Sequence, residues 1–396
     1  MLRENVTLLF FGNIQGEKDM RFLHLSDLHI GKRVHNFSML EDQKYILEQI
    51  LGIADEENVT GVIIAGDVYD KPVPSAEAVS LFDEFLVQLA ERELDVFVIS
   101  GNHDSPERIA FGEKLMRHKK VYLSPVYNGK IEPICLNDEF GTVKVFLLPF
   151  IKPVHVRHFL EEEVSDYTEA LACAISLMDI SQDERNVLVC HQFVTGAGRS
   201  ESEEISVGGL DNVDATVFEP FDYVALGHIH GPQNIGSERI RYCGTPLKYS
   251  FSEAEHKKSV TIVELGQKGD LSIRLRELNP MRDLIKIKGL FDEVTDKSFY
   301  KDLDTESYVQ ITLLDEDDIP NAFGKLATIY PNLMLMRYEN RRTMDGADIL
   351  SDGNEINMAP DVLFSQFYET MNNQPMTKEQ EAYMLALIEK IWGDNE

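Results

Sequence analysis

Residues Ile99 to Ser105 read ISGNHDS and place an amide, an imidazole and a carboxylate directly after the apolar run 96–99. A short apolar run of this kind is typical of a buried strand. Polar side chains at the end of a buried strand are costly to desolvate unless they find partners. The stretch therefore predicts a strand that delivers polar groups to a site, which other parts of the chain must complete.

Short apolar runs alternate with segments of helical periodicity along most of the chain. Apolar residues at helical spacing mark residues 39–53 and 76–92. This alternation favours an α/β sheet with helices on its faces. The predicted strands are residues 22–25, 59–65, 96–99, 143–148, 187–190 and 223–226, followed by a later set from 239 to 274.

Five of these runs are followed by residues that can bind metal ions. In open α/β sheets, ligands bind at the carboxyl ends of the strands, where loops from distant parts of the sequence converge. Glycines 66, 101 and 227 suit tight turns in which the backbone approaches a small ion. One cluster alone is more often a polar cap or a core histidine, but five at successive strand ends indicate one shared site. The clusters are Asp27 with His29, Asp67 with Asp70, Asn102 with His103 and Asp104, His191, and His228 with His230.

This mixture of side chains suits a pair of divalent metal ions. Two such ions about 3.5–4 Å apart can share a bridging carboxylate, activate a water and hold the oxygens of a phosphoryl group. We expect Asp67 to be the bridging carboxylate. Imidazole, carboxylate and amide ligands favour Mn, Fe or Zn over an all-oxygen Mg site, and the lack of thiolates argues against a structural zinc.

The ordered motifs DxH, GDxxD, GNHD, a single His and GHxH resemble those of the calcineurin-like metallophosphoesterase superfamily. Their flanks are similar to the bacterial SbcD family, the nuclease subunits of SbcC-SbcD complexes, which process DNA double-strand ends and hairpins. The resemblance implies a metallophosphoesterase-type β-sandwich flanked by helices, with a small α+β capping domain and C-terminal helices. The stretches that carry it are LHLSDLHIGK (23–32), EDQKYILEQI (41–50), GNHDSPERIAFG (101–112), VGGLDNV (207–213) and GTPLKYSFSEAEHKKSV (244–260).

The resemblance also implies a role for each matching residue. His103 would face the scissile phosphate, and Asp104 would orient it, because a carboxylate hydrogen bond fixes the tautomer of an imidazole. Asp70 would either accept a hydrogen bond from a ligand or only form a turn. The expected ions are two Mn²⁺, with Mg²⁺ as the alternative, and the expected reaction is in-line attack by a metal-activated water on a phosphodiester. One metal ion would be held by Asp27, His29, Asp67 and His230, and the other by Asp67, Asn102, His191 and His228.

The substrate class follows from the resemblance rather than from the ligands. It implies a double-strand exonuclease and a hairpin or single-strand endonuclease that serves DNA repair, recombination and replication. A small-molecule phosphodiesterase of the same superfamily and a non-enzymatic DNA-end scaffold are the alternatives. The net charge of −30 repels phosphate, so attraction to DNA would need bound cations, a basic patch or a partner, although acidity also keeps proteins soluble. Cations in loops beside the motifs either contact DNA phosphates or only face solvent: Lys32, Arg33, Arg108, Arg199, Lys248, Lys257 and Lys258. Of these we assign four to DNA binding: Lys32, Arg108, Arg199 and Lys248.

Changes in pattern divide the chain into five predicted segments. Beyond residue 278, the runs 282–290, 308–314, 322–329 and 333–338 read as strand, strand, helix and strand. A polar stretch rich in Gly, Asp and Asn then reads as a linker. The segments are an N-terminal extension (1–19, with Met20 as an alternative start to Met1), the metallophosphoesterase nuclease domain (20–279), the capping domain (280–340), the linker (341–359) and the C-terminal helices (360–396).

Two amphipathic helices are predicted near the C-terminal end. Pro360 suits a first helical position, and Thr377 with Gln380 forms a capping box. The helices are too short to form a core, so they either pack on this chain or, as the resemblance implies, dock onto an SbcC ATPase subunit. No GxxxxGK[ST] motif occurs, so ATP would be bound by that partner. The resemblance also implies a homodimer within a heterotetramer, formed by the helix at 39–53 and the one after Ser105.

Cysteine usage and hydropathy predict a cytoplasmic protein. The four cysteines are widely spaced, form no CxxC pair and read as reduced, buried thiols. No apolar stretch approaches the ~18 residues of a membrane span, and residues 6–11 are too few for the apolar region of a signal peptide. We therefore expect no contact with a membrane.

Overall fold

The computed structural model describes residues 20–159, 164–203, 211–340, 364–365, 368 and 375–392. The chain divides after Met281 into two compact units, close to the boundary predicted between residues 279 and 280. The predicted N-terminal extension, the linker and most of the first C-terminal helix lie outside the described residues. Each unit is described below by itself.

The first unit contains two six-stranded sheets, so the expected β-sandwich is confirmed. In each sheet four neighbouring strands are parallel and the remaining strands are antiparallel. The first sheet has the order β14 (Leu271–Glu277), β13 (Ser259–Leu265), β1 (Met20–Leu25), β4 (Gly61–Ala65), β5 (Asp95–Ile99) and β6 (Val121–Leu123). The second has the order β11 (Gln233–Ile235), β12 (Ser237–Tyr242), β10 (Tyr223–Gly227), β9 (Arg185–His191), β8 (Gly141–Leu148) and β7 (Ile134–Asp138).

The hydrophobic core of this unit lies between the two sheets. Phe22 and Phe97 from the first sheet pack edge to face, with ring centroids 5.9 Å apart. They join Val145, Val189 and Tyr223 from the second sheet in one fully buried cluster. Burial of a side chain of this size contributes about 1.5–3 kcal/mol. This core holds the strand ends of both sheets at fixed positions.

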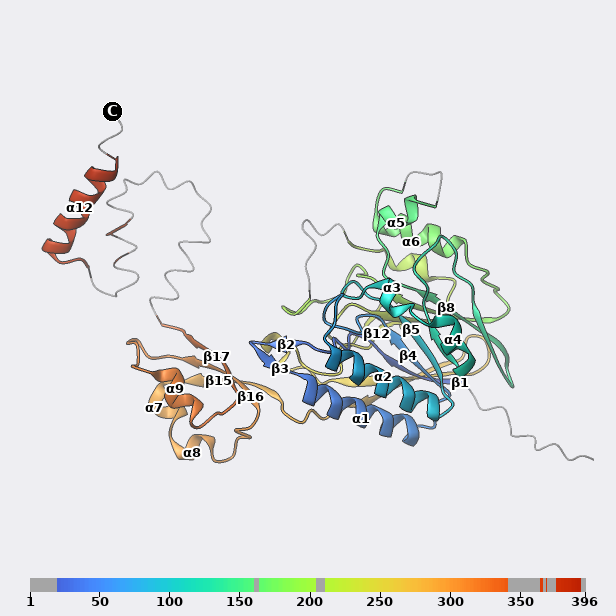
Figure 1. The fold of residues 1–396 in the computed structure, drawn as a ribbon, viewed down its shortest axis with the longest axis horizontal. Helices are drawn as coiled ribbons and strands as arrows, with labels where there is room; N and C mark the ends of the chain where they lie inside the picture. Colours follow the sequence, from blue (N-terminus) through green and yellow to red (C-terminus); the bar gives the residue numbers. More distant parts are fainter. Residues whose placement is uncertain are drawn as a thin grey trace, which may run out of the picture. The chain divides into compact units, whose positions relative to one another are not determined.

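Helices cover the outer faces of both sheets. Val62 and Ile64 alternate with the core residue Ile63 and are also fully buried, because α1 (Leu40–Glu56) and α2 (Ala76–Glu91) lie side by side along that face (Figure 1). On the second sheet, α5 (Pro153–Arg157) and α6 (Tyr167–Ser176) cover the opposite face through residues such as Leu171. The helices predicted at 39–53 and 76–92 are therefore confirmed.

The shorter elements of this unit connect the sheets and lie around their ends. They are β2 (Arg33–Val34), β3 (Phe37–Ser38), α3 (Pro106–Ile109), α4 (Glu113–Met116) and the 3-10 turns η1 (Arg117–Lys119), η2 (Ala215–Phe218) and η3 (Phe251–Glu253).

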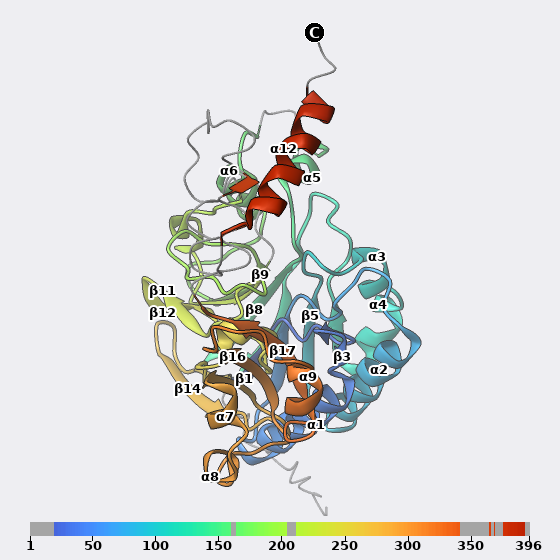
Figure 2. The ribbon, with the colours of Figure 1, turned by 90° about the vertical axis from the view of Figure 1, so that its left-hand side faces the viewer.

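The second unit contains a three-stranded parallel sheet with the order β15 (Leu284–Gly289), β16 (Tyr308–Leu313) and β17 (Leu333–Tyr338). Parallel neighbours need crossover connections, and here they are α7 (Phe291–Val294) with α8 (Lys297–Tyr300), and then α9 (Ala322–Ala327). Val294 and Leu326 of these helices pack on Val309 and Ile311 of the sheet. Figure 2 shows α7, α8 and α9 beside β16 and β17. The predicted order strand, strand, helix, strand is confirmed, and α7 and α8 are additions.

The second predicted C-terminal helix is α12 (Lys378–Trp392). Its capping box has formed: Thr377 N donates to Gln380 Oε1 at 2.9 Å, and Gln380 N donates to Thr377 Oγ1 at 3.3 Å. Among the described residues, every helix is too short or too polar to cross a bilayer.

Candidate metal centre

The carboxyl ends of β1, β4 and β5 in one sheet meet those of β9 and β10 in the other. Asp27 N donates to the carbonyl oxygen of Gly66 at 3.0 Å, which ties the ends of β1 and β4 together. A Cβ atom at Gly227 would run into the carbonyl oxygen of Ala65, and one at Gly66 would run into the imidazole of His191. These glycines therefore let the two sheets approach each other, rather than only letting the backbone approach an ion.

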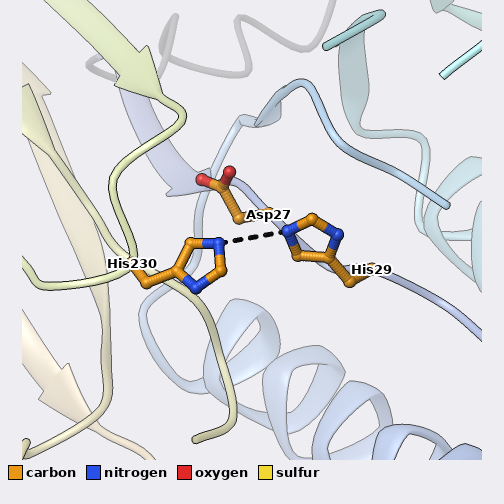
Figure 3. A group of neighbouring side chains, drawn as sticks. All are labelled: Asp27, His29 and His230. Atoms are coloured by element: carbon orange, nitrogen blue, oxygen red, sulfur yellow. Dashed lines mark hydrogen bonds between the residues drawn. The ribbon is translucent and has the colours of Figure 1, made fainter. Parts of the chain in front are cut away.

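Asp27, His29 and His230 form the first cluster of this centre (Figure 3). His29 Nε2 and His230 Nε2 lie 3.2 Å apart, and one carboxylate oxygen of Asp27 lies within 4.8 Å of both ligand atoms. The backbone N–H of His228 holds the Asp27 carboxylate, at 3.0 Å from Oδ1 and 3.1 Å from Oδ2. Burial lowers the pKa of His29 well below its ordinary value and raises that of Asp27. The His29 imidazole is therefore uncharged and has a nitrogen lone pair available at this point.

The second cluster consists of Asp67, Asn102, His191 and His228. His191 Nε2 lies 3.3 Å from Asp67 Oδ2 and 3.0 Å from Asn102 Oδ1. Asn102 Oδ1 also lies 3.0 Å from His228 Nδ1. Asp67 Oδ2 is 3.8 Å from His29 Nε2 in the first cluster. Asp67 thus lies between the two clusters, at the position expected of a bridging carboxylate.

The charges and protonation states at the centre fit a pair of cations. Burial opposes the ionisation of both partners, yet Asp67 raises the pKa of His191 to about 9, and His191 holds the pKa of Asp67 well below its usual range. Burial lowers the pKa of His228 to about 3, and its buried Nε2 has no hydrogen-bond partner among the described residues. In the metal-free protein His191 therefore carries a proton and pairs with Asp67, and a metal ion would displace that proton. Once it is released, the buried carboxylates, imidazole nitrogens and amide oxygen form a donor set that suits divalent metal ions.

Several of these residues have a strained backbone. Asp27, His29, Asp67 and His228 have φ angles of 53°, 45°, 49° and 101°. The left-handed conformation costs a non-glycine residue roughly 1–2 kcal/mol. Strain of this kind persists where the surrounding structure enforces it, typically at functional sites. The fold therefore holds these side chains in place at a cost in stability.

His103 lies beside Asp67 at the edge of the centre. Its backbone N–H donates to Asp67 Oδ1 at 2.9 Å, and its Nδ1 lies 3.2 Å from the carbonyl oxygen of Asp70. The His103 side chain is 18% exposed, and its Nε2 is 4.0 Å from Asp67 Oδ2. Asp70 also pairs with Lys32, at 2.8 Å. The Asp70 carboxylate lies 3.9 Å from Nδ1 of His29, which has no hydrogen-bond partner among the described residues, so a hydrogen bond from this ligand to Asp70 has not formed. Asp70 contacts Lys32 through its carboxylate and His103 through its backbone carbonyl.

The predicted hydrogen bond from Asp104 to His103 is wrong. The Asp104 carboxylate is turned under the loop after β4 and accepts the N–H groups of Val68 (3.0 Å), Tyr69 (2.9 Å) and Gly101 (2.9 Å). Burial and the nearby Asp67 raise the pKa of Asp104 to about 6, although these bonds oppose the shift. Backbone N–H groups that would otherwise be buried without partners compete successfully for this carboxylate. Asp104 therefore positions the loop that carries Asp67.

Three of the four predicted DNA-binding cations have partners within the chain. Lys32 pairs with Asp70, as described above, and Lys248 Nζ donates to the carbonyl oxygen of Ala254 at 2.5 Å. Arg199 pairs with Asp211 at 3.2 Å and lies 3.4 Å above the ring centroid of Phe193. Arg108 is exposed in the short helix α3. Contact of these cations with DNA remains a prediction.

The residues that support the centre were not predicted individually. Gln43 Nε2 donates to the carbonyl oxygen of His29 at 2.7 Å, and Tyr249 Oη donates to that of Leu28 at 2.6 Å. Glu253 and Lys258 form a buried ion pair behind His230. All four lie within the quoted stretches 41–50 and 244–260, but sequence spacing does not show which groups they contact. Lys258, expected to face DNA or solvent, is only 4% exposed, because its charge pairs with Glu253 inside the fold.

Comparisons with known proteins identify the family to which the chain belongs. A family model described as calcineurin-like phosphoesterase matches residues 20–232, and one described as the type 5 capsule protein repressor C-terminal domain matches residues 280–372. Two relatives named as the SbcD subunit of the nuclease SbcCD, from Staphylococcus epidermidis and Staphylococcus saprophyticus, are 31% and 30% identical, and each alignment covers 94% of this chain and 99% of the relative. A solved dimetal phosphatase from Danio rerio is 12% identical over 65% of this chain and 96% of its own, with a TM-score of 0.40.

The match to the phosphoesterase model implies divalent metal ions, and the donor set of the two clusters fits them. The chain therefore belongs to the calcineurin-like phosphoesterase family of metal-dependent phosphodiesterases and, within it, to the SbcD nuclease subunits.

Proposed function

We propose that this protein hydrolyses phosphodiester bonds at DNA ends and hairpins with two Mn²⁺ ions, as the nuclease subunit of a complex with an SbcC-type ATPase. The observation that carries the proposal is the pair of clusters that share Asp67, with Oδ2 at 3.8 Å from His29 Nε2 and 3.3 Å from His191 Nε2. Mg²⁺ is the alternative ion. Imidazole nitrogens among the ligands favour the softer Mn²⁺ over Mg²⁺.

The seven predicted ligands divide into two sets. Asp27, His29, Asp67 and His230 would hold one ion, and Asp67, Asn102, His191 and His228 would hold the other. When bound, two such ions activate a water for in-line attack and neutralise charge on the phosphoryl oxygens. The chain itself contributes a rigid arrangement of donors from five strand ends, so little reorganisation is needed on binding.

His103 is the residue that we expect to contact the phosphate. The carbonyl oxygen of Asp70 lies 3.2 Å from His103 Nδ1 and can only accept a hydrogen bond. His103 Nδ1 would therefore carry a proton and donate a hydrogen bond to this oxygen, while Nε2 faces the centre. The bond from His103 N to Asp67 Oδ1 fixes the ring beside the shared carboxylate. Nε2, when protonated, would donate to an oxygen of the phosphate or of the leaving group.

The proposed partner surface is the C-terminal helix. On α12 the side chains of Tyr383, Leu385 and Leu387 are 71%, 42% and 36% exposed. An amphipathic helix with exposed apolar residues can dock into a hydrophobic groove of another chain. The relatives named as SbcD subunits of SbcCD nucleases support an SbcC-type partner, which would also bind the ATP.

We further propose a homodimer within a heterotetramer, formed by α1 and by the helices α3 and α4 that follow Ser105. Phe111 and Leu115 in this region are 83% and 78% exposed, and large apolar side chains with this exposure mark interaction sites. The cytoplasm is the proposed compartment, because all four cysteines are free thiols. The prediction that all four are buried is wrong: Cys190 and Cys243 are buried, but Cys135 is exposed and Cys173 is partly exposed.

Cleavage by the purified protein tests the proposal. With Mn²⁺, we expect cleavage of hairpin and duplex-end DNA, enhanced by the SbcC-type ATPase, and no comparable cleavage of cyclic nucleotides. His103→Gln should keep Mn²⁺ binding in calorimetry and lose cleavage by roughly 10²–10⁴-fold, the usual contribution of a positioned acid or base. Preferred cleavage of cyclic nucleotides would favour the small-molecule alternative, and loss of Mn²⁺ binding in His103→Gln would contradict the role of His103.

A further inference from the structure

A buried ion pair lies behind His230, on the side of the Nδ1 atom. Lys258 and Glu253 are 4% and 0% exposed, and Lys258 Nζ lies 2.5 Å from Glu253 Oε2. Nζ also donates to the carbonyl oxygen of His230 at 2.9 Å and to Thr245 Oγ1 at 2.7 Å, so all three of its protons are used. Desolvation offsets most of the attraction in such a pair. Its place against a metal-ligating histidine therefore calls for a reason other than stability.

The hydroxyl of Ser202 connects this ion pair to the imidazole of His230. Ser202 Oγ donates to Glu253 Oε1 and lies 2.6 Å from His230 Nδ1. A hydroxyl has one proton to donate, and an ionised carboxylate can only accept. Since the proton of Ser202 goes to Glu253, Ser202 Oγ can only accept from His230. Nδ1 of His230 must then carry a proton.

The remaining polar atoms of His230 leave one nitrogen for a metal ion. The backbone N–H donates to Glu203 Oε1 at 2.6 Å, and the carbonyl oxygen accepts from Lys258 and from Thr245 N, the latter at 3.2 Å. Nε2 points into the first cluster, 3.2 Å from His29 Nε2 (Figure 3). A neutral imidazole that is protonated at Nδ1 has its lone pair at Nε2.

We propose that Glu253, held by Lys258 and acting through Ser202, fixes the tautomer of His230 and thereby keeps Nε2 unprotonated for a metal ion. Glu253 is a positioning residue, because it contacts a ligand of the centre and not the ion or the substrate. The inference rests on the metal centre of the proposed function but not on its DNA substrate. It applies to the metal-free protein, where the tautomer can be observed directly.

Glu253→Gln is the variant that tests this relay. The amide oxygen of the new glutamine can accept a hydrogen bond from either Lys258 or Ser202. The NH₂ group of the glutamine would then face whichever of these two donors the oxygen does not bind. Lys258 cannot become an acceptor, but the Ser202 hydroxyl can rotate. The hydroxyl proton of Ser202 would then point at His230 Nδ1, so Nδ1 must accept a hydrogen bond and cannot carry a proton. The imidazole proton of His230 therefore moves to Nε2. That proton would block the ligand atom.

Two measurements, one of the His230 tautomer and one of the Mn²⁺ affinity, test this expectation. In metal-free protein labelled with ¹⁵N-histidine, the long-range ¹H–¹⁵N spectrum distinguishes the two tautomers, and a His230→Gln spectrum assigns the signals. We expect an Nδ1 proton on His230 in the wild type and a shift to Nε2 in Glu253→Gln. In calorimetry, the affinity for one Mn²⁺ should fall by roughly 10–100-fold, the usual cost of removing a partner that orients a ligand.

Asp138→Asn is the matched control. Asp138 pairs with Arg185, and their side chains are 0% and 2% exposed, so this variant also disrupts a buried ion pair in the same unit. It should lose stability with no change in the tautomer of His230 or in Mn²⁺ affinity. Ser202→Ala provides a second variant should Glu253→Gln fail to fold. Because it removes the acceptor of the Nδ1 proton, it should weaken both the tautomer preference and Mn²⁺ binding.

The outcomes separate the inference from the proposed function. If Glu253→Gln, or Ser202→Ala in its place, keeps the Nδ1 proton and the wild-type Mn²⁺ affinity, the ion pair is only structural and the inference is wrong. If the wild type binds no Mn²⁺, the proposed function fails instead, and the tautomer comparison in the metal-free protein still decides the role of Glu253.

Discussion

The two ends of the sandwich in the first unit bury charge in different ways. At the end where β1 begins, Asp138 pairs with Arg185 between side chains that are 0% and 2% exposed. Asp138 also accepts the N–H groups of Met20 and Phe140, and Arg185 donates to the carbonyl oxygens of three further residues, Gly141, Leu265 and Gly266. At this end, the chain neutralises its own charge.

At the end where β1 terminates, His191 pairs with Asp67 and Lys258 pairs with Glu253, but several buried ligand atoms crowd together beyond these pairs. Asp27 and Asp67 lie among imidazole nitrogens, two of which, His29 Nε2 and His230 Nε2, are only 3.2 Å apart. Their backbone is strained at several positions, in contrast to the paired groups at the opposite end. The comparison teaches that burial alone does not identify a functional site. Buried ligand atoms that crowd together on a strained backbone, some of them without a hydrogen-bond partner as at His228 Nε2, do identify one.

The largest expected effect comes from Asp67→Asn. Loss of the shared carboxylate should lower Mn²⁺-dependent DNA cleavage by about 10³-fold or more, or ~4 kcal/mol of transition-state stabilisation. The rise in melting temperature that Mn²⁺ causes by binding the folded state should also disappear. Cleavage assays and thermal unfolding with and without Mn²⁺ measure both effects. An unchanged Mn²⁺-induced shift would show that Asp67 does not hold the ions.

Asp138→Asn should produce the opposite pattern. Removal of one partner leaves the Arg185 charge buried and under-compensated, which typically costs about 3–5 kcal/mol of the free energy of unfolding. Urea unfolding measures this loss, and calorimetry should return the Mn²⁺ affinity of the wild type. A change in Mn²⁺ affinity would mean that the two ends are energetically coupled, and the contrast between them would not hold.

Sequence reasoning predicted the centre better than its supports. The ligands follow apolar strands, so the topology of parallel strands brings their positions together. Glu253 and Lys258 are equally buried, but they lie near a 3-10 turn, where no periodicity indicates what a side chain contacts. Asp104 was misinterpreted for a related reason, since neighbours in a tight turn point in different directions and His103 faces away from it.

The helices and strands were likewise predicted unevenly: the long ones were predicted and the short ones were missed. The longer strands and α1 and α2 were predicted because their apolar patterns repeat several times. Strands as short as β6 (Val121–Leu123) and β11 (Gln233–Ile235) carry too few residues for a period to be recognised. The separation into two facing sheets was implied by the resemblance, because apolar runs alone do not tell which strands pair.

His24 provides the smallest expected effect and lies in β1 between the two ends. It is fully buried, its Nδ1 lies 2.8 Å from the hydroxyl of Tyr223, and burial lowers its pKa from 6.5 to about 3. Between these values the unfolded chain binds a proton that the folded protein does not. The contribution of His24 to stability is therefore complete above pH 6.5 and is lost as the pH falls towards 3. From pH 7 to pH 5 this loss amounts to about 2 kcal/mol.

The comparison with His24→Gln isolates this contribution, because groups at the metal centre titrate equally in both proteins. The amide can still hydrogen-bond to Tyr223 but does not take up a proton in this range. Urea unfolding of the metal-free proteins at pH 7 and pH 5 should therefore show a smaller pH-dependent loss of stability in the variant, by about 2 kcal/mol. Equal losses of stability in both proteins would mean that His24 becomes protonated in the folded state. The interior around β1 would then tolerate a buried positive charge that has no partner of opposite charge.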